Sequence, residues 1–147
     1  MSDFFKFFKS DSHEIKVDDD FNPVEMAASV LLIEMARADF EQDDLENEMI
    51  IELLKEYFLL DYEDVHDLFL EAEKIADNSV SLHEFTRTLH ETLNDEAKNE
   101  IIEMLWRLAL VDDSLDRYED YLVRKIADLL YVSNSSVLRI RHNLTSN

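Results

Sequence analysis

Apolar residues recur every three or four positions along most of the chain after residue 21, which is the period of a helix with one buried face. The first predicted helix begins at Asn22-Pro23, because a proline in the first helical turn gives up no hydrogen bond. It runs to about residue 38, and its expected buried stripe consists of Val24, Ala27, Ala28, Leu31, Leu32 and Met35.

The same period predicts two helices before residue 80. One covers about 44–57, and another begins near Asp61. The apolar positions expected to face the core of the first of these are Leu45, Met49, Leu53 and Tyr57.

Capping residues and the apolar period together predict the four remaining helices. Ser81 and Glu84 have the spacing of a capping box and open a helix over about 82–93, and Asn94 caps the next helix, which carries Trp106 on its core stripe. A sixth helix is expected over about 117–131, with Tyr121, Leu122, Ile126 and Leu129 toward the core. The last helix opens at Ser133 or Ser135 and holds Val137, Leu138 and Ile140.

Composition favours an all-α fold. The 147 residues include no glycine and one proline, Pro23, whereas the tight turns of sheets normally need glycine. We therefore expect a single-domain bundle of about seven helices over 21–147. The helix pairs at 22–57 and 95–131 form a predicted pseudo-repeat of two helix-loop-helix hairpins.

Residues 1–20 are expected to form an amphipathic segment followed by an acidic linker. The segment contains Phe4, Phe5, Phe7 and Phe8 beside only two lysines. We expect these phenylalanines to pack onto the helical domain. Peripheral membrane contact is the less favoured interpretation, because two lysines in an acidic neighbourhood attract lipid weakly. With no long apolar run in the sequence, we expect a cytoplasmic protein, with attachment to the periphery of the inner membrane as the alternative.

The net charge of −21 limits the classes of partner. It opposes nucleic-acid binding and favours cations and basic protein surfaces. The absence of cysteine excludes thiol catalysis, and the absence of glycine excludes a phosphate-binding loop.

An acidic cassette of the form D-x3-D-x2-E occurs twice, 73 residues apart. The first copy is Asp39, Asp43 and Glu46, and the second is Asp112, Asp116 and Glu119. Neither copy is an EF-hand, since Asp44 and Arg117 stand where its glycine is required. The last two carboxylates of each copy have capping-box spacing, which explains them without a ligand.

The capping explanation does not cover Asp39 and Asp112. Each follows the end of a predicted helix, where a carboxylate is unfavourable by about 0.3–1 kcal/mol. A bound cation would relieve this, and so would a basic neighbour such as Arg37 or Arg117. Ligands that are all oxygen atoms favour calcium or magnesium over zinc or copper.

Other candidate groups have simpler explanations. His83 and His90 are seven residues apart, too far along a helix to share one metal, and we expect the histidines to lie on the surface. The basic residues near the C-terminus are expected to pair with acidic loops, with a partner site as the alternative: Arg124, Lys125, Arg139 and Arg141.

Three segments of the chain resemble the TerB-like superfamily of small all-helical bacterial domains, named for tellurite-resistance protein B. They are LLIEMARADFEQDDLE, HEFTRTLHETLNDEAK and LWRLALVDDSLDRYEDYLVRKIADLLYVS. The chain departs from the family pattern where Phe40 and Asp113 replace its usual glycine. The resemblance implies an acidic, metal-binding site formed by the two cassettes, in a protein that belongs to stress-response or membrane-linked assemblies.

Two functions remain open from the sequence. The favoured one is a non-enzymatic scaffold or sensor whose cassettes bind a divalent cation. The other is a protein interaction module without metal, whose acidic face docks a basic or membrane-associated partner. We disfavour an enzyme, because nothing in the polar surroundings of the cassettes predicts the raised carboxylate pKa that acid–base catalysis would use.

Overall fold

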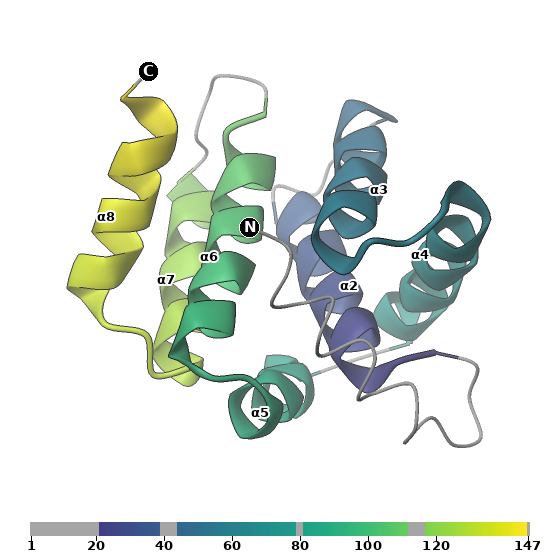
Figure 1. The fold of residues 1–147 in the computed structure, drawn as a ribbon, viewed down its shortest axis with the longest axis horizontal. Coiled ribbons are helices and arrows are strands. Elements are labelled where there is room, and N and C mark those ends of the chain that lie inside the picture. Colours follow the sequence, from purple (N-terminus) through teal and green to yellow (C-terminus); the bar gives the residue numbers. More distant parts are fainter. Residues whose placement is uncertain (1–20, 39–43, 79–80, 112–116, 147) are drawn as a thin grey trace.

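The computed structural model describes residues 21–38, 44–78, 81–111 and 117–146, and in these residues it contains seven helices and no strand (Figure 1). In chain order they are α2 (Pro23–Ala36), α3 (Asp44–Phe58), α4 (Tyr62–Asp77), α5 (Leu82–Thr92), α6 (Asp95–Ala109), α7 (Arg117–Leu129) and α8 (Asn134–Thr145). The predicted all-α class is confirmed. The predicted segment with Phe4, Phe5, Phe7 and Phe8 lies outside the described residues.

Helix α2 is the centre of the bundle. It contacts five other helices, with α3 and α4 on one side, α6 and α7 on the other, and α5 across one end (Figure 1). Helix α8 is peripheral and packs on α6 and α7. The core is therefore built around the first described helix.

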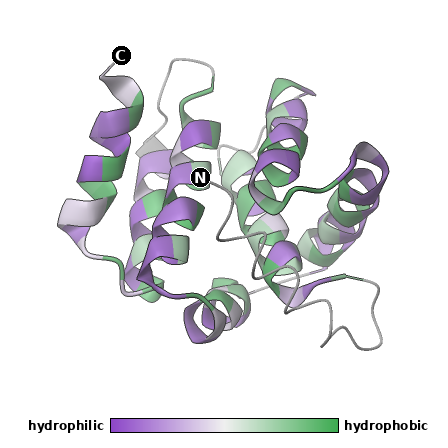
Figure 2. Ribbon diagram, viewed as in Figure 1, coloured by the Kyte–Doolittle hydropathy of each residue, from purple (hydrophilic) through white to green (hydrophobic). Residues whose placement is uncertain are grey.

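The residues of α2 are buried on all sides, and not only along the predicted stripe. Eleven of its 14 residues are buried, including Val30 and Ile33 on the side opposite that stripe. A helix that is apolar all round is typical of a position inside a protein. Figure 2 shows green hydrophobic residues along α2, whereas green and purple alternate on the outer helices. The buried hydroxyl of Ser29 donates to the carbonyl of Glu25 at 2.7 Å and so is satisfied within the helix.

Four helices begin at residues that the sequence predicts as caps. In each, the cap's side-chain oxygen accepts a backbone N–H two or three residues further on: Asn22, Ser81, Asn94 and Ser133. The Asn22 side chain accepts two such bonds, at 2.8 and 3.1 Å. Of the two serines considered for α8, Ser133 is the cap and Ser135 lies in the first turn.

Two helices end in a left-handed residue that is not glycine. Leu59 follows α3 with φ of 55°, and Tyr131 follows α7 with φ of 62°. Beyond Leu59, the Leu60 N–H donates to the Lys55 carbonyl at 3.3 Å, which closes the helix end. A left-handed residue with a Cβ costs roughly 1–2 kcal/mol. The chain has no glycine to avoid this cost.

Three residues predicted to face the core are exposed instead. Leu45 is 49% exposed, Tyr121 59% and Leu138 43%. Leu45 and Tyr121 lie near the starts of α3 and α7, outside stripes that pass through Leu53 and Ile126, and Leu138 lies on the outermost helix. In the part of the chain that the structure describes, no helix combines the length and apolarity needed to cross a membrane.

Candidate functional site

The structure describes two of the six cassette carboxylates. Glu46 is the third residue of α3, and Glu119 is the third residue of α7. Asp39, Asp43, Asp112 and Asp116 lie outside the described residues. The site can therefore be built from the two glutamates and from the helix ends that flank the loops.

Glu46 and Glu119 are buried in equivalent places. They are 6% and 5% exposed, and both make polar interactions. Each opens the buried stripe of its helix at the same spacing, which runs Glu46, Ile50, Leu53, Tyr57 in one copy and Glu119, Val123, Ile126, Leu130 in the other. A carboxylate is seldom this buried unless it is paired, hydrogen-bonded or bound to a metal.

Burial repeats through the preceding helices at the same offset of 73 residues. Fully or almost fully buried pairs at this offset in α2 and α6 are Ala28 and Ile101, Leu32 and Leu105, Ile33 and Trp106, and Ala36 and Ala109. Glu25 and Lys98 form a further pair, each 6% exposed. A pseudo-repeat of two helical hairpins would produce this pattern.

The helix ends that flank the two cassettes lie toward one edge of the bundle. Helices α2 and α6 contact each other and run in the same direction, so both end at the upper edge of Figure 1. Helices α3 and α7 begin at that edge. The fold therefore brings the starts of α3 and α7, which carry Glu46 and Glu119, toward the same end of the described bundle.

Arg37, a candidate neighbour for Asp39, is engaged at the end of α4. It caps α2, and its guanidinium forms an ion pair with Asp77 at 2.9 Å. Burial raises the pKa of Glu34, one turn earlier in α2, and Arg37 opposes part of that rise. The side chain of the other candidate, Arg117, lies outside the described residues.

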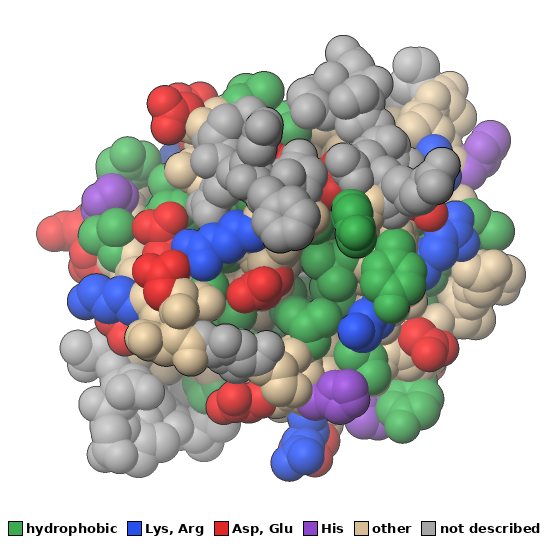
Figure 3. All heavy atoms as spheres, turned by 180° about the vertical axis from the view of Figure 1, so that it is seen from behind, with side chains coloured by type: hydrophobic (Ala, Val, Ile, Leu, Met, Phe, Trp, Pro, Cys, Tyr) green, Lys and Arg blue, Asp and Glu red, His purple; other side chains and the backbone are tan. Residues whose placement is uncertain are grey.

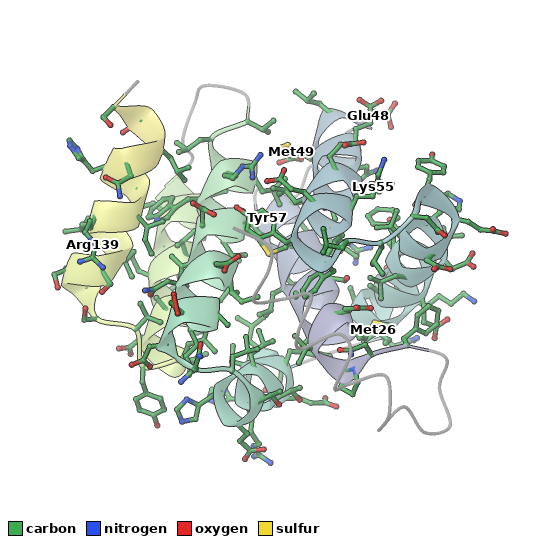
Figure 4. The ribbon with its side chains drawn as sticks, in the orientation of Figure 1. Met26, Glu48, Met49, Lys55, Tyr57 and Arg139 are labelled. Carbon is green, nitrogen blue, oxygen red and sulfur yellow. The ribbon has the colours of Figure 1, made fainter. Side chains whose placement is uncertain are left out.

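A polar network between α3 and α6 was not predicted. The Tyr57 hydroxyl, which Figure 4 shows between these helices, donates to the Glu103 carboxylate. Arg107 donates to the Tyr57 hydroxyl at 3.1 Å and to Glu56 at 3.0 Å. Burial and the bond to Glu103 raise the pKa of Tyr57. The spacing of apolar residues predicts a core position for Tyr57. This spacing carries no information about the hydrogen bonds of its hydroxyl.

Glu100 lies in α6, one turn before this network. Its surroundings disfavour the charged form of its carboxyl group. Burial, and then the nearby Glu103 and Glu96, raise its pKa to about 7. Its Oε1 atom is buried and has no hydrogen-bond partner within the described ranges. Nothing in an acid-rich helical pattern distinguishes Glu100 from its exposed neighbours, so its burial could not be predicted from the sequence.

The four described histidines are exposed, as predicted: His66, His83, His90 and His142. His90 nevertheless joins three elements. Its Nδ1 lies 2.7 Å from Nζ of the buried Lys98, and its ring packs against that of Tyr131 with centroids 4.6 Å apart. This contact ties α5 to α6 and to the turn after α7.

The residues that the structure describes contain no cluster of three or more histidine or carboxylate side chains that could hold a metal. A cation site would therefore need the loop aspartates together with Glu46 or Glu119. Buried carboxylate oxygens at the matching ends of α3 and α7 suit a hard cation such as calcium or magnesium.

The model of one protein family, described as tellurite resistance protein TerB, matches residues 25–142. This region spans all seven helices except the first two residues of α2 and the last turn of α8. Comparison with curated proteins and with solved structures found no significant match.

Proposed function

Because the chain belongs to the tellurite resistance protein TerB family, we propose that it is a non-enzymatic domain whose two cassettes bind a divalent cation, calcium or magnesium. In this role it would act as a scaffold or sensor in a bacterial stress-response assembly. The observation that carries the proposal is the matched burial of Glu46 and Glu119, one from each cassette.

Electrostatics favours this role for the cassettes. The cassettes contain six carboxylates in a chain whose net charge is already −21, and the two described ones, Glu46 and Glu119, are both buried. Like charges that are close together and partly removed from water repel each other strongly, and a divalent cation would relieve that repulsion. Binding would link the α2–α3 connection to the α6–α7 connection, so the cation level would control how firmly the two hairpins are held together.

Titration with calcium and with magnesium, followed by NMR of the backbone amides, tests the proposal. We expect saturable shifts at Asp39 and Asp112, together with a higher melting temperature. The double variant Asp39→Asn, Asp112→Asn should lose both responses, whereas Asp67→Asn on the exposed face of α4 should keep them. Unchanged amides at Asp39 and Asp112 up to millimolar cation would rule out the cation site.

The second candidate is an interaction module in which the cassettes only cap helices and the acidic surface docks a basic or membrane-associated partner. The position of Glu46 and Glu119 favours it, because the third helical residue is where the glutamate of a capping box belongs. It predicts that Asp43→Ala and Asp116→Ala each cost about 1 kcal/mol of stability. It also predicts a melting temperature that does not respond to divalent cations beyond their ionic strength.

A further inference from the structure

The C-terminal part of the chain has the opposite charge to the rest. Residues 117–147 carry five arginines and lysines and three acidic residues, for a net charge of +2. Residues 1–116 carry nine basic and 32 acidic residues, for a net charge of −23. Helices α7 and α8 therefore form a locally basic surface on a strongly acidic protein.

This basic surface contains a pocket of about 410 Å³ between α7 and α8. Its apolar lining comes from Tyr121, Val132 and Val137, and its polar lining includes Arg124, Lys125 and Asn134. Asp128 also lies at the pocket and offsets one positive charge. Figure 3 shows the face that carries α7, where green hydrophobic side chains lie between blue basic ones.

The positive charge at this surface is only partly neutralised. Arg124 and Arg141 share one carboxylate, that of Asp120, at 3.1 and 3.9 Å. Lys125 is exposed and forms no ion pair with any described residue. Arg139, on the outer side of α8 in Figure 4, donates a hydrogen bond to the Ser136 hydroxyl at 3.4 Å and forms no ion pair with the described part of the chain. An incoming carboxylate could therefore pair with Lys125 without displacing an existing partner.

We propose that the α7–α8 pocket docks an acidic segment of a partner protein, with its carboxylates against Lys125 and Arg124 and an apolar side chain against Val132 and Val137. Charge complementarity selects this occupant, because 32 acidic residues elsewhere on the chain leave α7 and α8 as the surface that attracts negative charge. The pocket is open to solvent, so an extended segment can place one of its side chains there. None of the residues that line the pocket belongs to a cassette, so docking there needs no cation at the cassettes.

The test uses the full chain in the presence of a metal chelator, so that cation binding at the cassettes does not affect the result. The probe is a short fluorescein-labelled peptide with glutamates on both sides of a leucine pair, followed by fluorescence anisotropy. Its controls are the same peptide with glutamine for every glutamate, and vesicles of phosphatidylglycerol.

We expect the acidic peptide to bind and the glutamine peptide to bind much more weakly, with affinity falling as salt rises. Lys125→Glu should weaken binding about tenfold or more, the loss of an interaction worth about 1.4 kcal/mol. The matched change Lys74→Glu on α4, which alters net charge equally, should weaken it by about twofold at most.

Equal loss of binding in the Lys125→Glu and Lys74→Glu variants would overturn the proposal, because it would indicate attraction by net charge alone. No binding of the acidic peptide at millimolar concentration would also overturn it. If vesicles bound in a Lys125-dependent manner and the peptide did not, the surface would be a membrane contact and not a peptide site.

Discussion

At the scale of single residues, the four charged residues that are almost fully buried in the described part of the chain occur in equivalent places. Glu25 and Lys98 are each 6% exposed in α2 and α6, and Glu46 and Glu119 are 6% and 5% exposed in α3 and α7. Burying an ionised group is costly unless hydrogen bonds or an opposite charge compensate. Because the four positions are related in pairs by the 73-residue offset, the bundle provides two matched polar positions in each hairpin.

Glu100 makes stability depend on pH in a predictable direction. Its pKa is raised by burial from 4.5 to about 7, so its contribution to stability is fully present below pH 4.5 and is lost as the pH rises through about 7. Glu100→Gln removes the charge and should stabilise the protein above pH 7 by up to about 1 kcal/mol, after allowance for solvent screening. Below pH 4.5 the variant and the wild type should be equally stable.

Urea unfolding on both sides of this pH range measures the effect. Glu52→Gln, at an exposed position of α3, is the matched control and should not reproduce this gain. An equal gain for Glu100→Gln at all pH values would show that a cause other than its ionisation is responsible.

At the scale of helices, the absence of glycine places strain at helix ends. Leu59 has φ of 55° while its side chain is 45% exposed, so its conformation is imposed by the end of α3 and its packing contributes little. Tyr131 has φ of 62°, but its ring also packs against that of His90. Of the two positions, Leu59 is the one at which the backbone strain can be separated from side-chain contacts.

Leu59→Gly should raise the free energy of unfolding by about 0.5–1 kcal/mol. Glycine removes the Cβ clash of the left-handed conformation, and the gain is reduced by its greater entropy in the unfolded chain. Leu59→Ala keeps the Cβ and should give no such gain. Chemical denaturation of the three proteins measures the difference, and a loss of stability in the glycine variant would mean that the Leu59 side chain contributes packing that its exposure conceals.

Helix starts could be predicted from the sequence because their signals are local. Asn22, Ser81 and Asn94 each cap the helix that follows, through hydrogen bonds within a few residues of chain. The burial of α2 on every side could not be predicted in the same way. It depends on five neighbouring helices, and a helical period reports only the face that is most apolar.

The hydrophobic pattern also did not predict which side of α3 and α7 is buried. Part of the candidate site therefore could not be predicted. Apolarity indicated Leu45 and Tyr121, whereas the stripes pass through the carboxylates of Glu46 and Glu119. The prediction placed the most hydrophobic residues in the core. In the fold, burial depends on where a residue lies on its helix, and a polar residue can be buried if its hydrogen bonds are satisfied. The capping-box spacing had singled out both glutamates, yet it carried no information about their burial.

At the scale of the whole molecule, charge opposes compactness. The chain of 147 residues carries a net charge of −21, and ion pairs such as Arg37–Asp77 and Lys74–Glu71 are at least partly exposed. Exposed ion pairs each contribute at most about 1 kcal/mol. The repulsion between surface carboxylates is therefore larger than the attraction within the ion pairs. Salt screens both, so its net effect is to remove repulsion.

Sodium chloride should accordingly stabilise the protein. Raising the ionic strength toward the physiological value, where charges are screened beyond about 8 Å, is expected to raise the melting temperature by a few degrees. Differential scanning calorimetry over a salt series measures this rise. A melting temperature that falls with salt would show that attractive pairs dominate over the net repulsion.

The central place of α2 has a consequence for how the protein is made. This almost wholly apolar helix precedes the other described helices in the chain, so it leaves the ribosome before the helices that cover it. Domains generally complete folding only when their contacting segments have all been synthesised, and exposed apolar surface promotes aggregation in the interval. Until α6 and α7 emerge, α2 lacks two of its five neighbours, and the nascent chain would depend on chaperones for longer than its small size suggests.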